Sequence, residues 1–90
     1  MQRAVVGKVH GRVQGVGFRY STIEQADALG VAGWVGNRYD GTVAFFIQGE
    51  SEHVEAMLAY LGEGPRAARV DRLETRDVAQ TPGLTGLGLG

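Results

Sequence analysis

Apolar and polar residues alternate along several stretches of the chain, which is the pattern of half-buried β-strands. In the first stretch, Val5, Val9 and Val13 fall on one face, and the other face is mostly polar. The last stretch is more polar throughout, with Val70 on one face and Leu73 on the other, which favours an edge strand. The strands predicted on this ground are residues 4–13, 32–37, 42–48 and 68–78.

Two further stretches have apolar residues at helical spacing. Ser21 and Glu24 have the spacing of a capping box, which predicts a helix that starts near Ser21 and ends at Gly30. A second helix is predicted to begin near Ser51 and to end at Gly62. Each helix therefore lies between two predicted strands.

The resulting order is β-α-β-β-α-β, which predicts an α+β fold of the ferredoxin-like, split-βαβ type. Its four-stranded antiparallel sheet should carry both helices on one face, because each crossover is right-handed. Asp40 and Gly41 favour a tight turn between the second and third strands. At 90 residues we expect one domain over 1–90, with residues 78–90 as a weakly ordered tail or a short terminal strand.

Composition removes several classes of function. The absence of cysteine excludes disulfides, thiolate metal sites and cysteine nucleophiles. The two histidines, His10 and His53, are far apart in the sequence, so we expect neither a metal site nor a cofactor. The apolar run at the N-terminus is too short for a signal peptide, and the net charge is only −1. We therefore expect a cytoplasmic monomer without nucleic-acid or membrane partners.

The segment between the first strand and the first helix has the composition of an anion-binding loop. Its glycines allow successive backbone N–H groups to turn toward one ligand, and the following helix adds the positive end of its dipole. Arg19 lies at this junction, and its guanidinium offers two parallel donors to a phosphate. The predicted phosphate-binding residues are Gly15, Val16, Gly17, Phe18, Arg19 and Tyr20. By spacing alone, an ordinary glycine turn is the more common explanation of such a segment.

A second candidate residue, Asn37, falls at the end of the second predicted strand. An amide both donates and accepts hydrogen bonds, so it is suited to holding a water molecule in line for attack. If the second strand lies beside the first, Asn37 reaches the same phosphate loop. Thr42 is a candidate for bracing that loop by hydrogen bonding. The alternative is that Asn37 only begins the turn, as asparagine often does.

Together the two segments resemble the acylphosphatase family. The run Gly-Arg-Val-Gln-Gly-Val-Gly-Phe-Arg at 11–19 is similar to its first signature. Gly-Trp-Val-Gly-Asn at 33–37, with Asp-Gly-Thr-Val at 40–43 and Gly49, is similar to its second, and a weaker similarity continues to 64–67. The resemblance implies a metal-free hydrolase that cuts the carboxyl–phosphate bond of acyl phosphates. It also implies that Arg19 binds the phosphate and that Asn37 orients the attacking water.

The sequence departs from the family pattern at two places. Gly36 stands where the family usually has a longer, often basic residue, so the strand is expected to be looser. The Gly- and Leu-rich C-terminus lacks the aromatic or β-branched ending that usually completes an extra strand. Three alternatives remain at this level: a non-enzymatic phosphate-binding module, a carbamoyl-phosphate-handling module, and RNA binding on the sheet. The natural acyl phosphate is not specified by the sequence.

Overall fold

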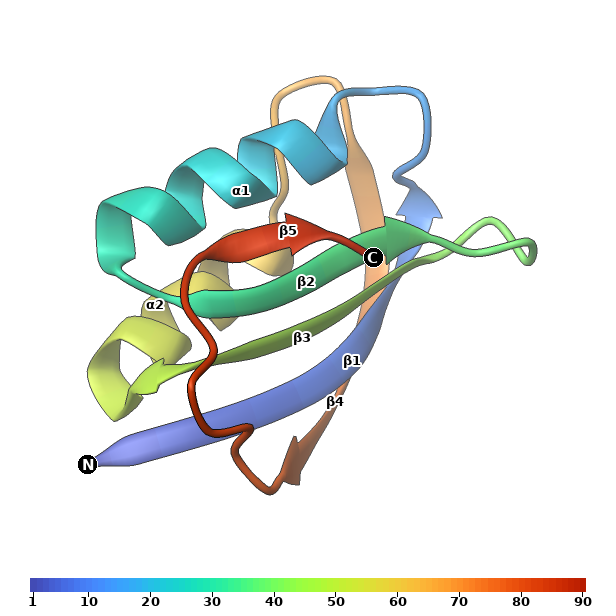
Figure 1. The fold of residues 1–90 in the computed structure, drawn as a ribbon. Helices are drawn as coiled ribbons and strands as arrows, with labels where there is room; N and C mark the ends of the chain where they lie inside the picture. Colours follow the sequence, from blue (N-terminus) through green and yellow to red (C-terminus); the bar gives the residue numbers. More distant parts are fainter.

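The computed structural model describes all 90 residues as one five-stranded sheet with two helices (Figure 1). The strand order across the sheet is β4-β1-β3-β2-β5. The ferredoxin-like fold class is confirmed, with one strand more than the four expected. Along the chain the elements are β1 (Gln2–Arg12), α1 (Phe18–Leu29), β2 (Ala32–Asn37), β3 (Val43–Glu50), α2 (Ser51–Leu61), β4 (Arg69–Val78) and β5 (Leu87–Leu89).

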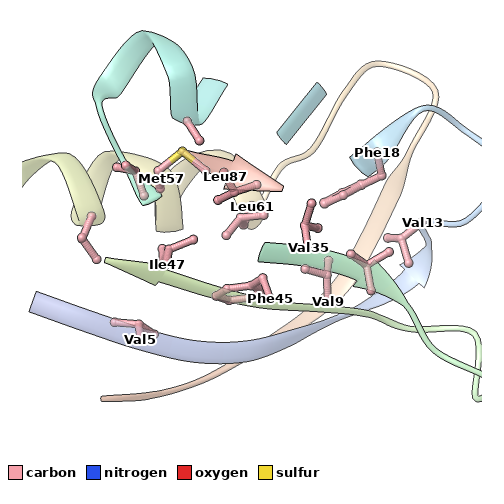
Figure 2. Close-up of a cluster of buried hydrophobic side chains, with 14 residues drawn as sticks. Val5, Val9, Val13, Phe18, Val35, Phe45, Ile47, Met57, Leu61 and Leu87 are labelled. Carbon is pink, nitrogen blue, oxygen red and sulfur yellow. The ribbon is translucent and has the colours of Figure 1, made fainter. Parts of the chain in front are cut away.

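The hydrophobic core lies between the sheet and the two helices (Figure 2). The strands contribute the alternating residues that the sequence pattern assigns to one face, such as Val5 and Val9 in β1 and Phe45 in β3. The helices contribute Ala26 from α1 and Met57 from α2, both fully buried. The core therefore fixes the register of the strands, because a shift of one residue would turn these side chains away from the helices.

The additional strand, β5, pairs in parallel with β2 at the edge of the sheet, so the sheet is mixed rather than purely antiparallel. Leu87 of this strand enters the core and is 6% exposed. The segment that leads to β5 crosses the face of the sheet away from α2 (Figure 1). It is attached there by Thr81, whose N–H donates to Gln48 Oε1 and whose C=O accepts from Gln48 Nε2, both at 2.8 Å.

Strand β4 forms one edge of the sheet, as its polar sequence indicates, but Val70 and Leu73 do not lie on opposite faces. Both Val70 and Leu73 pack against the core cluster. A β-bulge explains the difference: His10 pairs with Arg72 and Gly11 pairs with Val70, which leaves Asp71 as an extra residue. One inserted residue reverses the alternation of side chains, so residues three apart reach the same face.

Candidate active site

The loop between β1 and α1 is held by apolar side chains and exposes its glycines. Val16 packs against the core. Val13 and Phe18 are buried in this core (Figure 2). Between them Gly15 and Gly17 are exposed and have φ values of 72° and 77°. Positive φ is accessible to glycine at little cost, so the chain can turn twice here while its neighbours remain anchored.

Helix α1 begins at Phe18, three residues before the start that the Ser21–Glu24 spacing predicted. The residue that caps the helix is Gly17, in the left-handed region, and the Ser21 N–H donates to the Gly17 carbonyl at 3.0 Å. Ser21 is thus already inside the helix, and its hydroxyl bonds to Tyr60 of α2 instead of capping. The predicted capping box is wrong because the glycine cap starts the helix one turn earlier.

The early start leaves a group of backbone donors without partners. No side chain caps α1, its first turn contains no acidic residue, and no N–H between Gly15 and Tyr20 donates within the protein. The first turn of a helix concentrates its positive partial charge on these N–H groups. The loop and helix start therefore form a site suited to an anion.

Arg19 occupies the first turn of α1, beside these donors. Its side chain is partly exposed and makes no hydrogen bond or ion pair within the protein. The neighbouring Tyr20 is 65% exposed. Phe18, in contrast, has its ring in the core, so only its backbone N–H can face a ligand.

Asn37 ends β2, as the sequence analysis expected, but β2 does not lie beside β1. Strand β3 lies between them, pairing with β1 on one side and with β2 on the other. The side chain of Asn37 is partly buried, and its Oδ1 is buried without any hydrogen-bond donor from the protein. A buried acceptor left unpaired costs on the order of 1–3 kcal/mol, so this atom is a strong indication of a polar partner outside the chain.

The Gln14 side chain connects the loop after β1 with the turn after β2, although β3 lies between these two strands. Its Nε2 donates to the carbonyl of Arg38 at 2.7 Å and to the carbonyl of Thr42 at 2.9 Å. The loop that precedes Arg19 is thereby attached to the turn that follows Asn37. Gln14 was not among the predicted site residues, and the only signal for it in the sequence is its place within the first signature.

The turn between β2 and β3 is further held by Asp40. Its Oδ1 accepts hydrogen bonds from the Thr42 hydroxyl at 2.6 Å and the Thr42 N–H at 3.0 Å, and its Oδ2 pairs with Lys8 at 3.2 Å. The hydrogen bonds from Thr42, followed by that from Lys8, hold the pKa of the Asp40 carboxyl well below its usual range. Asp40 therefore acts as an ionised turn former. Thr42 is buried at 5% exposure and contacts Gln14 through its carbonyl.

These elements meet at one end of the molecule: the loop after β1, the first turn of α1 and the end of β2 (Figure 1). A hollow of about 550 Å³ at this end is lined by Gln14, Asn37, Arg38 and Tyr39. Arg19 is not among the lining residues and makes no hydrogen bond with Asn37. Elsewhere, no three His, Asp or Glu side chains come together as metal ligands would, and no helix is long and apolar enough to cross a membrane.

Comparison with known proteins identifies the family in which this arrangement occurs. The acylphosphatase family model matches residues 5–86. The chain belongs to the acylphosphatase family. Among curated relatives, the acylphosphatase of Nocardioides sp. is 46% identical over 89 residues, covering 99% of this chain and 89% of that protein. The crystal structure of acylphosphatase from Bacillus subtilis superposes with a TM-score of 0.90 at 30% identity and covers 100% of this chain and 99% of that one.

The same fold also occurs as part of a larger protein. The crystal structure of HypF from T. kodakarensis matches 98% of this chain with a TM-score of 0.84 and 29% identity, but the match covers only 12% of that chain. Acylphosphatase relatives of similar length are therefore the more informative comparison. Their shared name and coverage show that the function is that of an acylphosphatase, a hydrolase of acyl phosphates.

Proposed function

We propose that the loop from Gly15 to Tyr20 binds the phosphoryl group of the substrate and that Arg19 and Asn37 perform the hydrolysis. The observation that carries this proposal is the set of backbone N–H groups from Gly15 to Tyr20 that have no partner in the protein. Three phosphate oxygens need several donors at once, and a glycine loop that leads into a helix provides them in one place. The Arg19 guanidinium adds two parallel donors and a full positive charge.

The proposed role of Asn37 follows from its unpaired Oδ1. This atom can accept a hydrogen bond from a water molecule and so direct one of the water's lone pairs toward phosphorus. A fixed nucleophile contributes through positioning, which converts a collision with bulk water into a step within the complex. Thr42 and Asp40 support this role indirectly, because the hydrogen bonds between them hold the turn that follows Asn37.

The reaction needs no general acid. The water oxygen forms a bond to phosphorus, and the bond between phosphorus and the carboxyl oxygen breaks with its electron pair on the carboxylate. Both protons of the water remain on the released phosphate. A carboxylate has a conjugate acid with a pKa of about 4, so it leaves without protonation at neutral pH. Stabilisation of charge and positioning of water then suffice, as in phosphoryl transfer generally.

The substrate is proposed to be a small acyl phosphate. The product that the loop binds is inorganic phosphate. Acetyl phosphate, carbamoyl phosphate, glycolytic acyl phosphates and phosphoaspartyl proteins all contain the reacting group. The enzyme is proposed to act as a cytoplasmic monomer, without metal or cofactor and without nucleic-acid or membrane partners. Ordinary alkyl phosphates are expected to be poor substrates, because an alkoxide leaving group requires an acid.

The deciding experiment measures hydrolysis of benzoyl phosphate by metal-stripped protein, together with competitive inhibition by inorganic phosphate. Arg19→Ala is expected to weaken phosphate inhibition and to lower the rate by roughly 10²–10³ or more. Asn37→Ala is expected to slow turnover while phosphate inhibition remains nearly unchanged. Arg66→Ala, an exposed arginine in the loop after α2, serves as the control and should behave like the wild type. Equal loss of phosphate affinity in the Arg19 and Asn37 variants would refute the division of roles.

A further inference from the structure

The face of the sheet opposite the helices carries the largest hollow of the molecule, with a volume of about 570 Å³. Most side chains that face it, such as Val6, Lys8 and Ala44, alternate with core residues of the same strands, so they belong to the side that neither helix covers. The segment leading to β5 crosses only one part of this face, where Gln48 holds Thr81. The residues that line the hollow include Val6, Lys8, Trp34, Arg38, Ala44, Glu74 and Arg76.

The charged residues of this groove are mostly basic. Glu74 is its only carboxylate, and it is engaged by His10 and Arg72, which hold its pKa below the usual value. Of the cations, Lys8 pairs with Asp40 at 3.2 Å, whereas Arg76 makes no hydrogen bond or ion pair within the protein. The groove therefore has a surplus of positive charge despite the net charge of −1 for the whole chain.

The floor of the groove is apolar and includes an aromatic ring. Val6 and Ala44 lie on neighbouring strands, and Trp34 lies on the next strand, opposite Phe46. The Arg38 guanidinium sits 5.1 Å from the centre of the Trp34 ring, and one of its nitrogens donates to the Asn37 carbonyl at 3.2 Å. Arg38 has five N–H donors, so most of them remain for a ligand.

We propose that this groove is a second ligand site, separate from the phosphoryl loop, and that it binds a nucleoside phosphate. The flat base would lie against the apolar floor formed by Val6 and Ala44, beside the Trp34 ring, over which the Arg38 guanidinium lies. The phosphate would be held by Arg38 and Arg76 at the margin, with Lys8 adding charge. An apolar floor combined with separate cations selects a ligand that has both a planar apolar part and an anionic part. The volume lies within the range of about 300–1,000 Å³ that is usual for small-molecule sites.

Arg38 would connect this site to the reaction. It lines both the groove and the hollow next to Asn37, and its carbonyl accepts the hydrogen bond from Gln14. A phosphate that draws the Arg38 guanidinium away from the Asn37 carbonyl alters the end of β2. A bound nucleotide should therefore change the turnover of acyl phosphate without competing for the phosphoryl loop.

The test uses the fluorescence of Trp34, the only tryptophan of the chain. The full-length protein is titrated with AMP, with adenosine and with inorganic phosphate. AMP is expected to give a saturable change with a Kd at least about tenfold lower than either part alone, which corresponds to about 1.4 kcal/mol of additional binding free energy. The change should persist in Arg19→Ala, which removes the key cation of the phosphoryl loop and so separates this proposal from the proposed function.

Two exposed arginines provide the matched variants. Arg76→Gln should weaken AMP binding at least about fivefold, as the loss of a charge-assisted contact predicts, whereas Arg66→Gln, outside the groove, should leave it unchanged. The proposal is overturned if AMP binds no better than phosphate, if both arginine variants weaken binding equally, or if the signal disappears in Arg19→Ala. The last outcome would assign the nucleotide to the phosphoryl loop.

Discussion

Gln14 offers the sharpest test of how the two halves of the active site are held together. Its Nε2 donates two hydrogen bonds to the turn after Asn37, and no other side-chain hydrogen bond joins the β1–α1 loop to that turn. Replacing it with Met keeps the length and approximate shape of the side chain but removes both donors. Replacing it with Glu places a carboxylate against two carbonyl oxygens. Gln14→Glu should therefore be the more damaging change.

The expected loss of stability follows from the partners that remain. A hydrogen bond contributes a net of about 0.5–1.5 kcal/mol, so two bonds give an upper value of about 3 kcal/mol. The Thr42 carbonyl still accepts from the Arg38 N–H at 2.9 Å, and the Arg38 carbonyl still accepts from the Gly41 N–H at 3.1 Å. Because neither carbonyl is orphaned, Gln14→Met should cost about 1–2 kcal/mol in the free energy of unfolding, measured by urea denaturation.

The effect of Gln14→Met on kcat distinguishes a role in positioning Asn37 from a role in stability alone. Loosening the turn displaces Asn37 relative to the phosphoryl loop, and a displacement near 1 Å lowers rates by up to about 10²-fold. Gln14→Met should therefore lower kcat for benzoyl phosphate while inhibition by phosphate is unchanged. The control is Gln25→Met, because Gln25 in α1 makes no side-chain hydrogen bond. A Gln14→Met enzyme with wild-type kcat, or one whose phosphate affinity falls instead, would show that this connection does not position Asn37.

Three further changes test separate parts of the structure. A Cβ at Gly36 would lie 2.1 Å from the Gly90 carbonyl oxygen, so Gly36→Ala should displace β5 and lower the free energy of unfolding by about 1–3 kcal/mol. Gly88→Ala is the control and should not lower it, because nothing lies within 4 Å of a Cβ at Gly88. The pKa of Asp40 is depressed in the folded state, so its stabilisation is complete above the unfolded value near 3.9 and is lost as pH falls below it. The difference in unfolding free energy between the wild type and Asp40→Asn should accordingly shrink below about pH 4, and a difference independent of pH would contradict this assignment. Arg19→Lys should recover little of the activity lost in Arg19→Ala, because a point charge does not replace a planar pair of donors, and near-complete recovery of kcat/KM would show that charge alone is sufficient.

The parts of the fold that follow from local periodicity could be predicted from the sequence. The alternation of Val5 and Val9 places β1 correctly, and the spacing of apolar residues around Met57 places α2. The features that could not be predicted depend on backbone conformation or on distant pairing. The start of α1 depends on the left-handed conformation of Gly17, and the facing of Val70 depends on a bulge opposite β1.

The candidate site also contains one part that could be predicted from the sequence and one part that could not. The residues from Gly15 to Tyr20 are contiguous, so their glycine spacing and the following helix are visible in one short stretch of sequence. The placement of Asn37 depends instead on the order of strands, and the condition that β2 lies beside β1 is not met, because β3 lies between them. The connection runs through the Gln14 amide, and a single side chain that bonds to two carbonyls more than 20 residues away has no periodic signal in the sequence.

The two departures from the family pattern turn out to be related through one contact. A side chain at position 36 would collide with the Gly90 carbonyl oxygen, and a Cβ at Gly90 would lie 2.8 Å from the Trp34 ring. The Gly90 N–H donates to the Val35 carbonyl at 2.8 Å, which extends the pairing of β5 beyond its last residue. The absence of a side chain at both glycines therefore lets the C-terminal segment lie flat against β2. In this chain the glycine at position 36, expected to loosen the strand, instead leaves room for Gly90 to lie beside β2.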